Sequence, residues 1–321
     1  MDTRHTAQPA DARVRVVSFY AFTDLPGYRA LREPLLQRCR DLGLRGTILL
    51  AGEGVNGTVA GPVDAVERLL DRLSAELGGA RLQVRHAWAA DAPFLRMKVR
   101  LKKEIVSLGV GGIDPRTDAG SYVAPADWNA LIDRAEVRVI DTRNRYEVHL
   151  GRFEGAEDPG TEAFRDFPAW ADRHLDPERD RHVAMYCTGG IRCEKATAYL
   201  KSRGFEHVYH LEGGILNYLE QVPEADSRWR GECFVFDERV TVDHALEAGD
   251  HALCPACRMP LEEEDFGHPD YVENLCCPRC APGQGPERRA ALRERARQLD
   301  LAAKRGEPHL GPGASVERDD D

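Results

Sequence analysis

The stretch HVAMYCTGGIRCEKA, residues 182–196, combines an apolar run, a glycine-containing loop and a helix-forming run in immediate succession. The apolar run leads directly into Cys187, Gly189 and Gly190 follow, and the helix is expected to begin at about Arg192. The glycines allow backbone N–H groups to turn toward the sulfur, and the helix N-terminus adds the positive end of its dipole. Both effects stabilise a thiolate, so the stretch predicts an α/β domain with a reactive cysteine at Cys187.

Helices and strands alternate on both sides of this loop. The expected helices are 125–133, 162–174 and 192–203, and the expected strands are 137–140, 182–186 and 207–210. Such alternation is typical of an α/β domain with a parallel sheet, which we place at residues 122–226.

The predicted active-site loop has the length of a small anion cradle. Its candidate residues are Cys187, Thr188, Gly189, Gly190, Ile191 and Arg192. Four residues separate Cys187 from Arg192, whereas the phosphatase signature has five, so the cradle suits a persulfide better than a phosphate. The alternative is a structural cysteine at the end of a buried strand, which the glycines and the arginine disfavour.

The N-terminal third predicts a ferredoxin-like domain over residues 13–110. Expected strands at 14–20, 46–51 and 82–86, helices at 28–42 and 62–77, and a hairpin give the order βαββαβ. Asn56-Gly57 is the hairpin signal. GEGVNG (52–57) matches the dinucleotide fingerprint GxGxxG only formally, because a probable strand and not a helix follows it. GGIDPRTDAG, within 111–121, is the expected linker.

The C-terminal part, residues 227–310, carries a cysteine pattern typical of a zinc module. Cys254-x-x-Cys257 is followed after nineteen residues by Cys277-x-x-Cys280. Four thiolates would close a tetrahedral shell and staple a segment with little core of its own. Cys276 leaves the register of one ligand open, and unmetallated or redox-active thiols are the alternative. A helix at 286–305 follows.

Bulk composition sets the broad class. The 321-residue chain has a net charge of −10, no apolar run of membrane-spanning length and a polar start without a secretory signal. We therefore expect a cytoplasmic, multidomain protein with no membrane partner, and disordered tails at 1–12 and 311–321. The negative charge disfavours indiscriminate nucleic-acid binding, so any RNA-binding surface must be local.

One short segment concentrates positive charge. It contains Arg96, Lys98, Arg100, Lys102 and Lys103. Strand alternation projects at least three of these side chains from one face. That face could follow RNA phosphates, or it could be an ordinary solvated surface.

The motifs around the loop resemble rhodanese domains. The matching strings are VIDTR (139–143), YE (146–147), GRFEGA (151–156), the Cys187 loop, and GF (204–205) followed by LEGGI (211–215). The resemblance implies that Asp141 and Arg143 lie near the loop and assist it, with Glu147 a partner for an arginine. A buried ion pair that only orders the sheet is the competing interpretation for Asp141 and Arg143.

A narrower resemblance covers most of residues 14–280. LLAGEGVNGTVAG (49–61), FLRMKVRLKKEIVSLG (94–109), VIDTRNRYEVHLGRFEGA (139–156), MYCTGGIRCEKA (185–196) and GECFVFDERVTVDHAL (231–246) are similar to the rhodanese-related bacterial tRNA uridine(34) hydroxylases. The resemblance implies tRNA as substrate, dioxygen as co-substrate and conversion of the wobble uridine to 5-hydroxyuridine.

The sequence leaves the oxygen chemistry open. It contains no recognisable flavin, haem, nicotinamide or two-histidine-one-carboxylate iron site. The Cys187 thiolate could add to C6 of uracil, or the sulfur could act as a persulfide. Cys193, where rhodanese domains commonly have serine, could resolve an oxidised Cys187 or be inert. A persulfide sulfurtransferase and a non-catalytic RNA-binding protein are the competing functions.

Overall fold

The computed structural model describes residues 14–305, so both tails predicted to be disordered lie outside the described residues. Contacts divide the chain into two compact units. The first unit runs to Asp237 and includes Thr241–Gly249, and the second comprises Glu238–Val240 and the chain from Asp250 onward. We describe each unit by itself.

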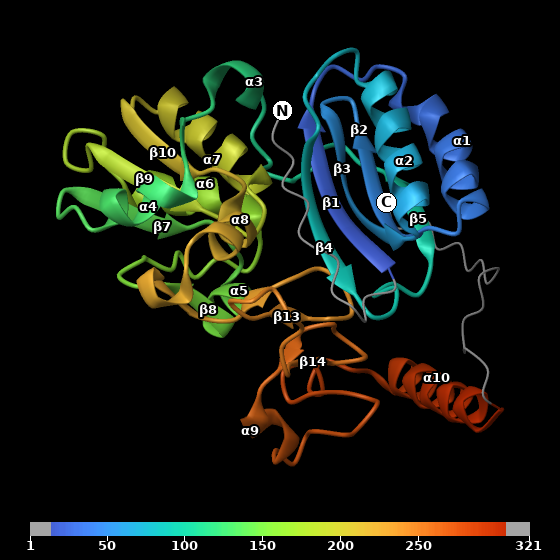
Figure 1. Cartoon of the computed structure of the whole chain (residues 1–321). Coiled ribbons are helices and arrows are strands. Elements are labelled where there is room, and N and C mark those ends of the chain that lie inside the picture. The colour runs from blue at the N-terminus through green and yellow to red at the C-terminus, as the bar shows by residue number, and fades with distance from the viewer. Residues whose placement is uncertain (1–13, 306–321) are drawn as a thin grey trace. The chain divides into compact units, whose positions relative to one another are not determined.

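The first unit begins with a five-stranded sheet and two helices (Figure 1). Its elements are β1 (Val14–Phe22), α1 (Tyr28–Asp41), β2 (Arg45–Ala51), β3 (Gly54–Gly61), α2 (Val63–Glu76), β4 (Gln83–Ala89) and β5 (Met97–Leu101). The strand order is β4-β1-β3-β2-β5, in which β5 is parallel to β2 and the other pairs are antiparallel. The predicted ferredoxin-like βαββαβ arrangement is confirmed, and β5 extends it by one edge strand.

The hairpin turn was predicted at the wrong glycine. β2 and β3 are joined at Gly52-Glu53, with Ala51 paired to Gly54, whereas Asn56-Gly57 lies inside β3. A Cβ on Gly57 would come within 2.9 Å of both Phe19 Cζ and the Thr47 carbonyl oxygen. Gly57 therefore allows close packing at the centre of the sheet and does not form a turn.

The two faces of this sheet differ in chemistry. Alternation along β1 places Val17 and Phe19 in the core with α1 and α2, and it places Ser18 and Tyr20 on the opposite face. Strand register brings Arg85, Ser18, Thr58, Thr47 and Lys98 into one row across all five strands of that opposite face. The helix-free face thus carries a polar row across its centre.

A second sheet, entirely parallel, forms the predicted rhodanese α/β domain. Its strands are β6 (Ser121–Val123), β7 (Val137–Asp141), β9 (His182–Tyr186) and β10 (His207–Leu211), in the order β6-β10-β9-β7. The helical elements are α3 (Pro115–Asp118), α4 (Pro125–Ile132), α5 (Arg145–Leu150), η1 (Phe164–Asp166), α6 (Phe167–His174), α7 (Ile191–Ser202), α8 (Gly214–Gln221) and η2 (Glu224–Asp226). Separate apolar clusters contain α6 with α7 and α4 with α8, so both sheet faces are covered.

The boundaries of this domain differ from those expected from sequence. The expected linker contains α3 and the start of β6. At the other end, β11 (Trp229–Gly231) pairs with β8 (Gly151–Phe153), and β12 (Cys233–Phe234) pairs with β13 (Thr241–Val242). Trp229 packs edge-on against Phe153 and Tyr186. This aromatic packing joins residues 229–237 to the first unit and not to the second unit.

The second unit is small. It contains β14 (Ala252–Leu253), β15 (Pro260–Leu261), α9 (Glu263–Phe266) and α10 (Pro286–Arg305), which matches the expected helix. Its buried apolar cluster consists of Leu261, Cys254 and Cys277. Within residues 14–305, no helix is long and apolar enough to cross a membrane.

Candidate active site

The loop between β9 and α7 encloses the sulfur of Cys187. The Gly190 N–H donates a hydrogen bond to Cys187 Sγ at 3.1 Å. Gly190 has φ +97°, a left-handed conformation that favours glycine, whereas Gly189 does not have a positive φ. Of the two predicted glycines, only Gly190 is therefore required by backbone conformation.

Cys187 and Cys193 form a hydrogen-bonded pair of sulfurs. Burial alone would raise the pKa of Cys187, but a hydrogen bond from Cys193, the charge of Arg192 and the backbone N–H groups of Cys193 and Arg192 lower it to about 6. Burial and the neighbouring Cys187 raise the pKa of Cys193 well above its ordinary value. Cys187 is thus the sulfur of the pair that ionises more readily, and Cys193 is the hydrogen-bond donor.

Arg192 is held by a buried carboxylate. Its two terminal nitrogens bind Glu147 at 2.6 and 2.7 Å, and its Nη2 also reaches Thr188 Oγ1 at 3.3 Å. Despite burial, the charge of Arg192 keeps the pKa of Glu147 below its ordinary value. The ion pair fixes the guanidinium beside the loop, and Glu147 is the arginine partner expected from sequence.

A second glycine turn supports the loop from behind. Ile215 and Leu216 at the start of α8 donate backbone hydrogen bonds to the carbonyls of Cys187 and Thr188 at 2.9 and 3.1 Å. Gly214 has φ +68°, and a Cβ there would stand 2.4 Å from the Cys187 carbonyl oxygen. The close approach of α8 to the loop therefore requires glycine at position 214.

Asp141 and Arg143 do not line the cavity described below. Both are fully buried, with Arg143 Nη2 2.6 Å from Asp141 Oδ2. Arg143 also donates to the carbonyl oxygens of Glu147 and Gly151, and its guanidinium stacks over Trp229 at 5.1 Å. The geometry favours the competing interpretation from sequence, an ion pair that orders the ends of β7 and α5.

A cavity of about 570 Å³ opens onto the loop. The loop contributes Cys187, Thr188, Gly189, Ile191 and Arg192. The opposite wall is the helix-free face of the ferredoxin-like sheet, with side chains such as Ser18, Tyr20, Thr58 and Arg85. Phe236, 59% exposed, also lines the cavity, and the Arg192 guanidinium lies 5.8 Å from its ring centroid. The site is therefore composite, because neither domain forms it alone.

Two partly buried contacts join these walls. Tyr20 donates a hydrogen bond to Glu194 at 2.7 Å. Lys195, 2% exposed, binds Glu53 and Glu104 at 2.8 and 2.6 Å and donates to the Val106 carbonyl oxygen. Both α7 residues directly follow Cys193, so the helix that carries the loop also binds the ferredoxin-like domain.

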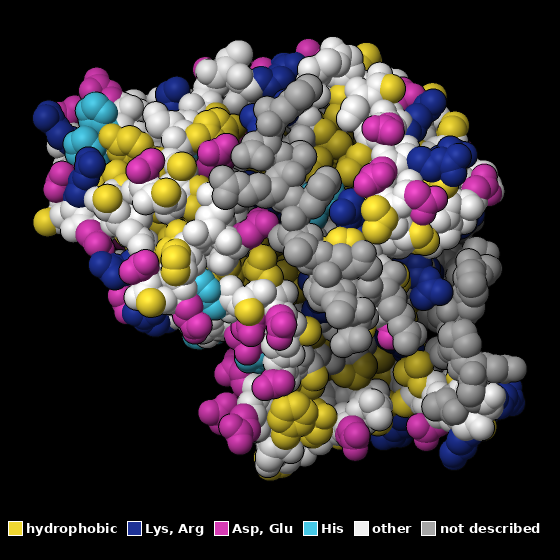
Figure 2. All heavy atoms as spheres, viewed as in Figure 1, with side chains coloured by type: hydrophobic (Ala, Val, Ile, Leu, Met, Phe, Trp, Pro, Cys, Tyr) yellow, Lys and Arg dark blue, Asp and Glu magenta, His cyan; other side chains and the backbone are white. Residues whose placement is uncertain are grey.

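The basic segment reaches the cavity through one residue. Met97 and Val99 of β5 are buried, and Lys98 and Arg100 alternate with them on the other face. Lys102 lines the cavity, whereas Arg96, Lys98, Arg100 and Lys103 do not. Figure 2 shows acidic and basic side chains interspersed over the face in view. The five residues therefore do not act together at the cavity.

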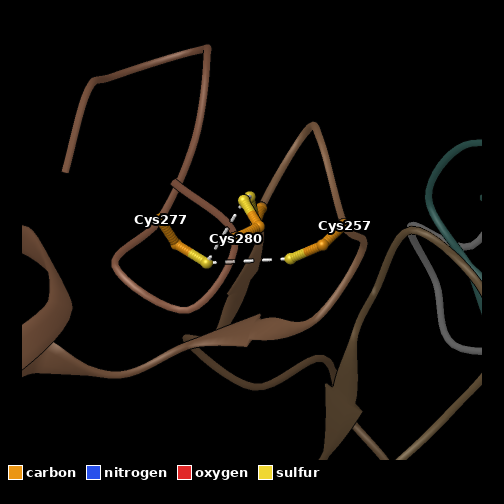
Figure 3. A group of neighbouring side chains, drawn as sticks. Cys257, Cys277 and Cys280 are labelled. Atoms are coloured by element: carbon orange, nitrogen blue, oxygen red, sulfur yellow. Dashed lines mark hydrogen bonds between the residues drawn. The ribbon is translucent and has the colours of Figure 1, made fainter. Parts of the chain in front are cut away.

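The second unit gathers four cysteines (Figure 3). The sulfurs of Cys254, Cys257, Cys277 and Cys280 all lie within 4.8 Å of one another. The Cys254–Cys280, Cys257–Cys277 and Cys277–Cys280 sulfurs are 3.8, 3.6 and 3.9 Å apart. Tetrahedral Zn–S bonds of about 2.3 Å give S···S edges of roughly 3.8 Å. Cys276 lies outside the cluster and donates to the Asp270 carbonyl oxygen, so the four gathered sulfurs include Cys277 and not Cys276. The cluster fits a tetrahedral metal ion.

Family models match both domains of the first unit. Residues 14–105 match the UPF0176 acylphosphatase like domain, and residues 124–221 match the Rhodanese-like domain. Fold and site together define a rhodanese-related protein whose cysteine loop faces an acylphosphatase-like sheet.

Curated relatives align along nearly the whole chain. A tRNA uridine(34) hydroxylase of Mesorhizobium japonicum is 56% identical over 93% of this chain and 97% of its own length. Namesakes in Caulobacter vibrioides and Teredinibacter turnerae are 53% and 51% identical over 94% of this chain, covering 97% and 94% of their own lengths. The chain belongs to the tRNA uridine(34) hydroxylase family.

Several cavity residues had not been selected from the sequence. Tyr20 and Arg85 sit in ordinary alternating strands, and Phe236 follows a two-residue strand. Lys195 does not line the cavity but joins its walls through Glu53 and Glu104, and in the sequence it is one of many helix cations. Two of the family strings carried a signal, because MYCTGGIRCEKA includes Lys195 and GECFVFDERVTVDHAL includes Phe236. Tertiary contacts of the sheet face bring the others to the loop.

Proposed function

We propose that this chain hydroxylates uridine at position 34 of tRNA to 5-hydroxyuridine, with the Cys187 sulfur essential. The observation that carries the proposal is a depressed-pKa thiolate at the wall of a two-domain cavity, in a chain of this family. A rhodanese loop alone would be equally suited to sulfur transfer. The second cavity wall provides room for a larger substrate.

In this proposal the loop residues hold the sulfur as an anion. The Gly190 N–H, the α7 N-terminus and Arg192 stabilise the thiolate, Thr188 and Glu147 orient Arg192, and Gly189 and Ile191 shape the wall. Asp141 and Arg143 are positioning residues behind the loop. Cys193 donates a hydrogen bond to Cys187, and a resolving role would require its thiol to attack an oxidised Cys187.

The cavity suits a single nucleotide drawn out of an RNA loop. Enzymes that act on a base unstack it into a pocket, and exposed aromatic rings commonly stack on it. Phe236 offers such a ring at the cavity, beside the Arg192 guanidinium. Lys102 supplies positive charge at the same opening, and the other members of the basic segment would contact RNA outside it.

The overall reaction needs dioxygen and a reductant. One oxygen atom of O₂ enters at C5 of uracil, and the other leaves as water after taking up two electrons and two protons from a two-electron donor. The proposal assigns Cys187 as the residue that makes C5 reactive, either by thiolate addition at C6 or as a persulfide. The choice between these two routes belongs to experiment.

The four-cysteine cluster would hold a structural zinc ion. Cys254, Cys257, Cys277 and Cys280 fill all four tetrahedral positions, so the ion would have no open position for substrate. Its contribution is to fold a unit that otherwise has only a small apolar cluster.

A gene deletion tests the proposed activity. We expect tRNA from a deletion strain to lack 5-hydroxyuridine at position 34, and plasmid-borne wild-type protein to restore it, as read by nucleoside mass spectrometry. Unchanged 5-hydroxyuridine in the deletion strain would contradict the activity.

The rhodanese-like loop also supports a second candidate, a persulfide sulfurtransferase. Loading Cys187 with sulfane sulfur from thiosulfate and measuring transfer to a thiol would test it. Rapid transfer by a protein whose deletion leaves 5-hydroxyuridine intact would select this function over the first.

A further inference from the structure

Arg85 of β4 lies at the cavity, where the ferredoxin-like sheet meets the glycine turn before α8. A Cβ on Gly213 would stand 1.9 Å from the Arg85 Nη2 and 2.6 Å from its Cζ. Gly213 has φ +71° and precedes Gly214 and Ile215, and the Ile215 N–H donates to the Cys187 carbonyl oxygen. The guanidinium therefore lies next to the backbone that supports the active-site loop.

Arg85 is a half-buried cation without a contacting anion among the described residues. Among residues 14–305 it forms no hydrogen bond or ion pair. Burial lowers its pKa from the ordinary value, and the through-space attraction of Glu220 and Glu212 offsets only part of that effect. Burying an unpaired charge is unfavourable for folding, so the presence of an unpaired guanidinium at this position calls for a functional explanation.

The other buried cations near the loop already have partners. Arg192 is bound by Glu147, and Lys195 is bound by Glu53 and Glu104. Along the cavity, Arg85 and the exposed Lys102 remain available for an anionic ligand. They come from opposite edges of the sheet, because β4 and β5 are its outer strands.

We propose that Arg85 is a substrate-binding residue whose guanidinium binds a phosphodiester group of the RNA strand entering the Cys187 cavity. The inference rests on the proposed function, and it assigns a phosphate contact that the basic segment does not provide. Uracil carries no formal charge, whereas a phosphodiester restores the electrostatic balance of an unpaired guanidinium and matches its planar donor geometry.

The row beside Arg85 fits the same assignment. Ser18 and Thr58 follow Arg85 across the sheet and hydrogen-bond to each other through their hydroxyls at 2.9 Å. Hydroxyl groups are common ligands of phosphate and ribose oxygens. A single strand crossing this face would meet Arg85, these hydroxyls and then Lys102.

The test compares Arg85→Gln with Arg85→Lys, using an anticodon stem-loop RNA with uridine at position 34. The matched control is Arg68→Gln, which removes the same charge from an exposed position on α2, on the far side of the sheet. Binding is measured against salt in a Cys187→Ser background, so turnover is not needed. Hydroxylation kinetics are measured with Cys187 present.

For Arg85→Gln we expect a rise in KM of about tenfold, little change in kcat, and a salt-dependence slope reduced by about 0.7, the value for one phosphate contact on a single strand. Arg85→Lys should keep the slope, and Arg68→Gln should behave as wild type. Thermal stability of Arg85→Gln should be unchanged or higher, because an unpaired cation is removed.

A wild-type KM and salt slope in Arg85→Gln would overturn the inference. A fall in thermal stability that Arg85→Lys restores would assign Arg85 a structural role and overturn it as well. A wild-type protein that binds no tRNA would instead refute the proposed function. The two failures are therefore distinguishable.

Discussion

At the scale of single residues, Cys187 and Cys193 are given opposite acid–base character by their surroundings. Cys187 receives a backbone hydrogen bond from Gly190 and the charge of Arg192, whereas Cys193 is buried beside the Cys187 anion. Thr142 Oγ1 lies 3.4 Å from Cys193 Sγ and holds the second sulfur in place. Reactivity should therefore be confined to Cys187.

The first prediction concerns the pH dependence of Cys187 alkylation. Because its pKa is lowered to about 6, the thiolate persists at neutral pH and is lost as pH falls through that value. Cys193→Ala removes a hydrogen bond that lowers this pKa, so the midpoint of the iodoacetamide rate profile should move upward. Cys193→Ser keeps a donor and should stay near wild type.

A midpoint near 8.5 in the wild-type protein would contradict this assignment. Hydroxylation in Cys193→Ser separately tests the resolving role, because an unchanged rate would make Cys193 a hydrogen-bond donor only.

The second prediction concerns the buried Arg192–Glu147 pair. Glu147→Gln leaves a buried guanidinium without its counter-ion, so we expect a loss of about 3 to 5 kcal/mol in the free energy of unfolding, measured with urea. Glu162→Gln removes the acid of the exposed Arg145–Glu162 pair and should change stability by less than about 1 kcal/mol. Equal losses in the free energy of unfolding for the two substitutions would contradict the claim that burial makes the Arg192–Glu147 pair more important for stability than the exposed pair.

Sequence reasoning reached Cys187, Arg192 and Glu147 because they lie on one short loop or in a family motif. Arg85 was missed, since nothing in a strand residue's local pattern says which other domain its side chain will face. Phe236 lies in a family string but was not singled out, because it follows a strand of only two residues. The Asp141–Arg143 pair was found by motif, but its full burial away from the cavity could be learned only from packing.

At the scale of elements, α7 both carries the active-site loop and binds the neighbouring domain. Glu104, which binds Lys195 of α7, also accepts hydrogen bonds from the backbone N–H groups of Leu108 and Gly109. Although burial opposes it, the hydrogen bonds from Lys195 and from these amides keep the pKa of Glu104 below its ordinary value. The pair with Lys195 therefore stabilises the two-domain wall.

The third prediction follows from the sign of that shift. A carboxyl group with a lowered pKa in the fold contributes stability at neutral pH, and this contribution is lost as pH falls below about 4.5 toward the folded-state pKa. Lys195→Met should remove about 3 kcal/mol at pH 7 and much less at pH 3.5, measured by urea unfolding at each pH. A pH-independent loss would contradict the ion-pair account.

The elements of both sheets were largely predictable, because apolar alternation and turn residues are local signals. The hairpin was misplaced by four residues because Gly57 is required by packing against Phe19 and Thr47, a cause that the turn signal of Asn56-Gly57 does not distinguish. Strands of two or three residues such as β8, β11 and β12 are too short to show alternation.

At the scale of the whole molecule, the chain combines a first unit with several apolar clusters of its own and a second unit with very little buried apolar surface. From sequence, the boundary between the rhodanese domain and the C-terminal part was expected at residue 227, where the pattern changes to short strands and paired cysteines. The structure instead keeps Trp229 with Phe153 and Tyr186, because an aromatic side chain is stabilised by joining a large core.

The fourth prediction is one zinc ion per chain, measured by elemental analysis. Cys277→Ser should lose the ion, and limited proteolysis should then cleave residues 250–305 while the first unit stays folded on its own core. Cys276→Ser is the matched control and should keep the ion, since Cys276 lies outside the cluster. If Cys276→Ser lost the zinc ion and Cys277→Ser kept it, Cys276 and not Cys277 would be the ligand.

The most direct test of the central claim, that the Cys187 sulfur carries out wobble-uridine hydroxylation, is nucleoside mass spectrometry of tRNA from a deletion strain expressing Cys187→Ser. The account predicts no 5-hydroxyuridine at position 34, with full restoration by wild-type protein at the same expression level. Normal 5-hydroxyuridine in the Cys187→Ser strain would contradict the account.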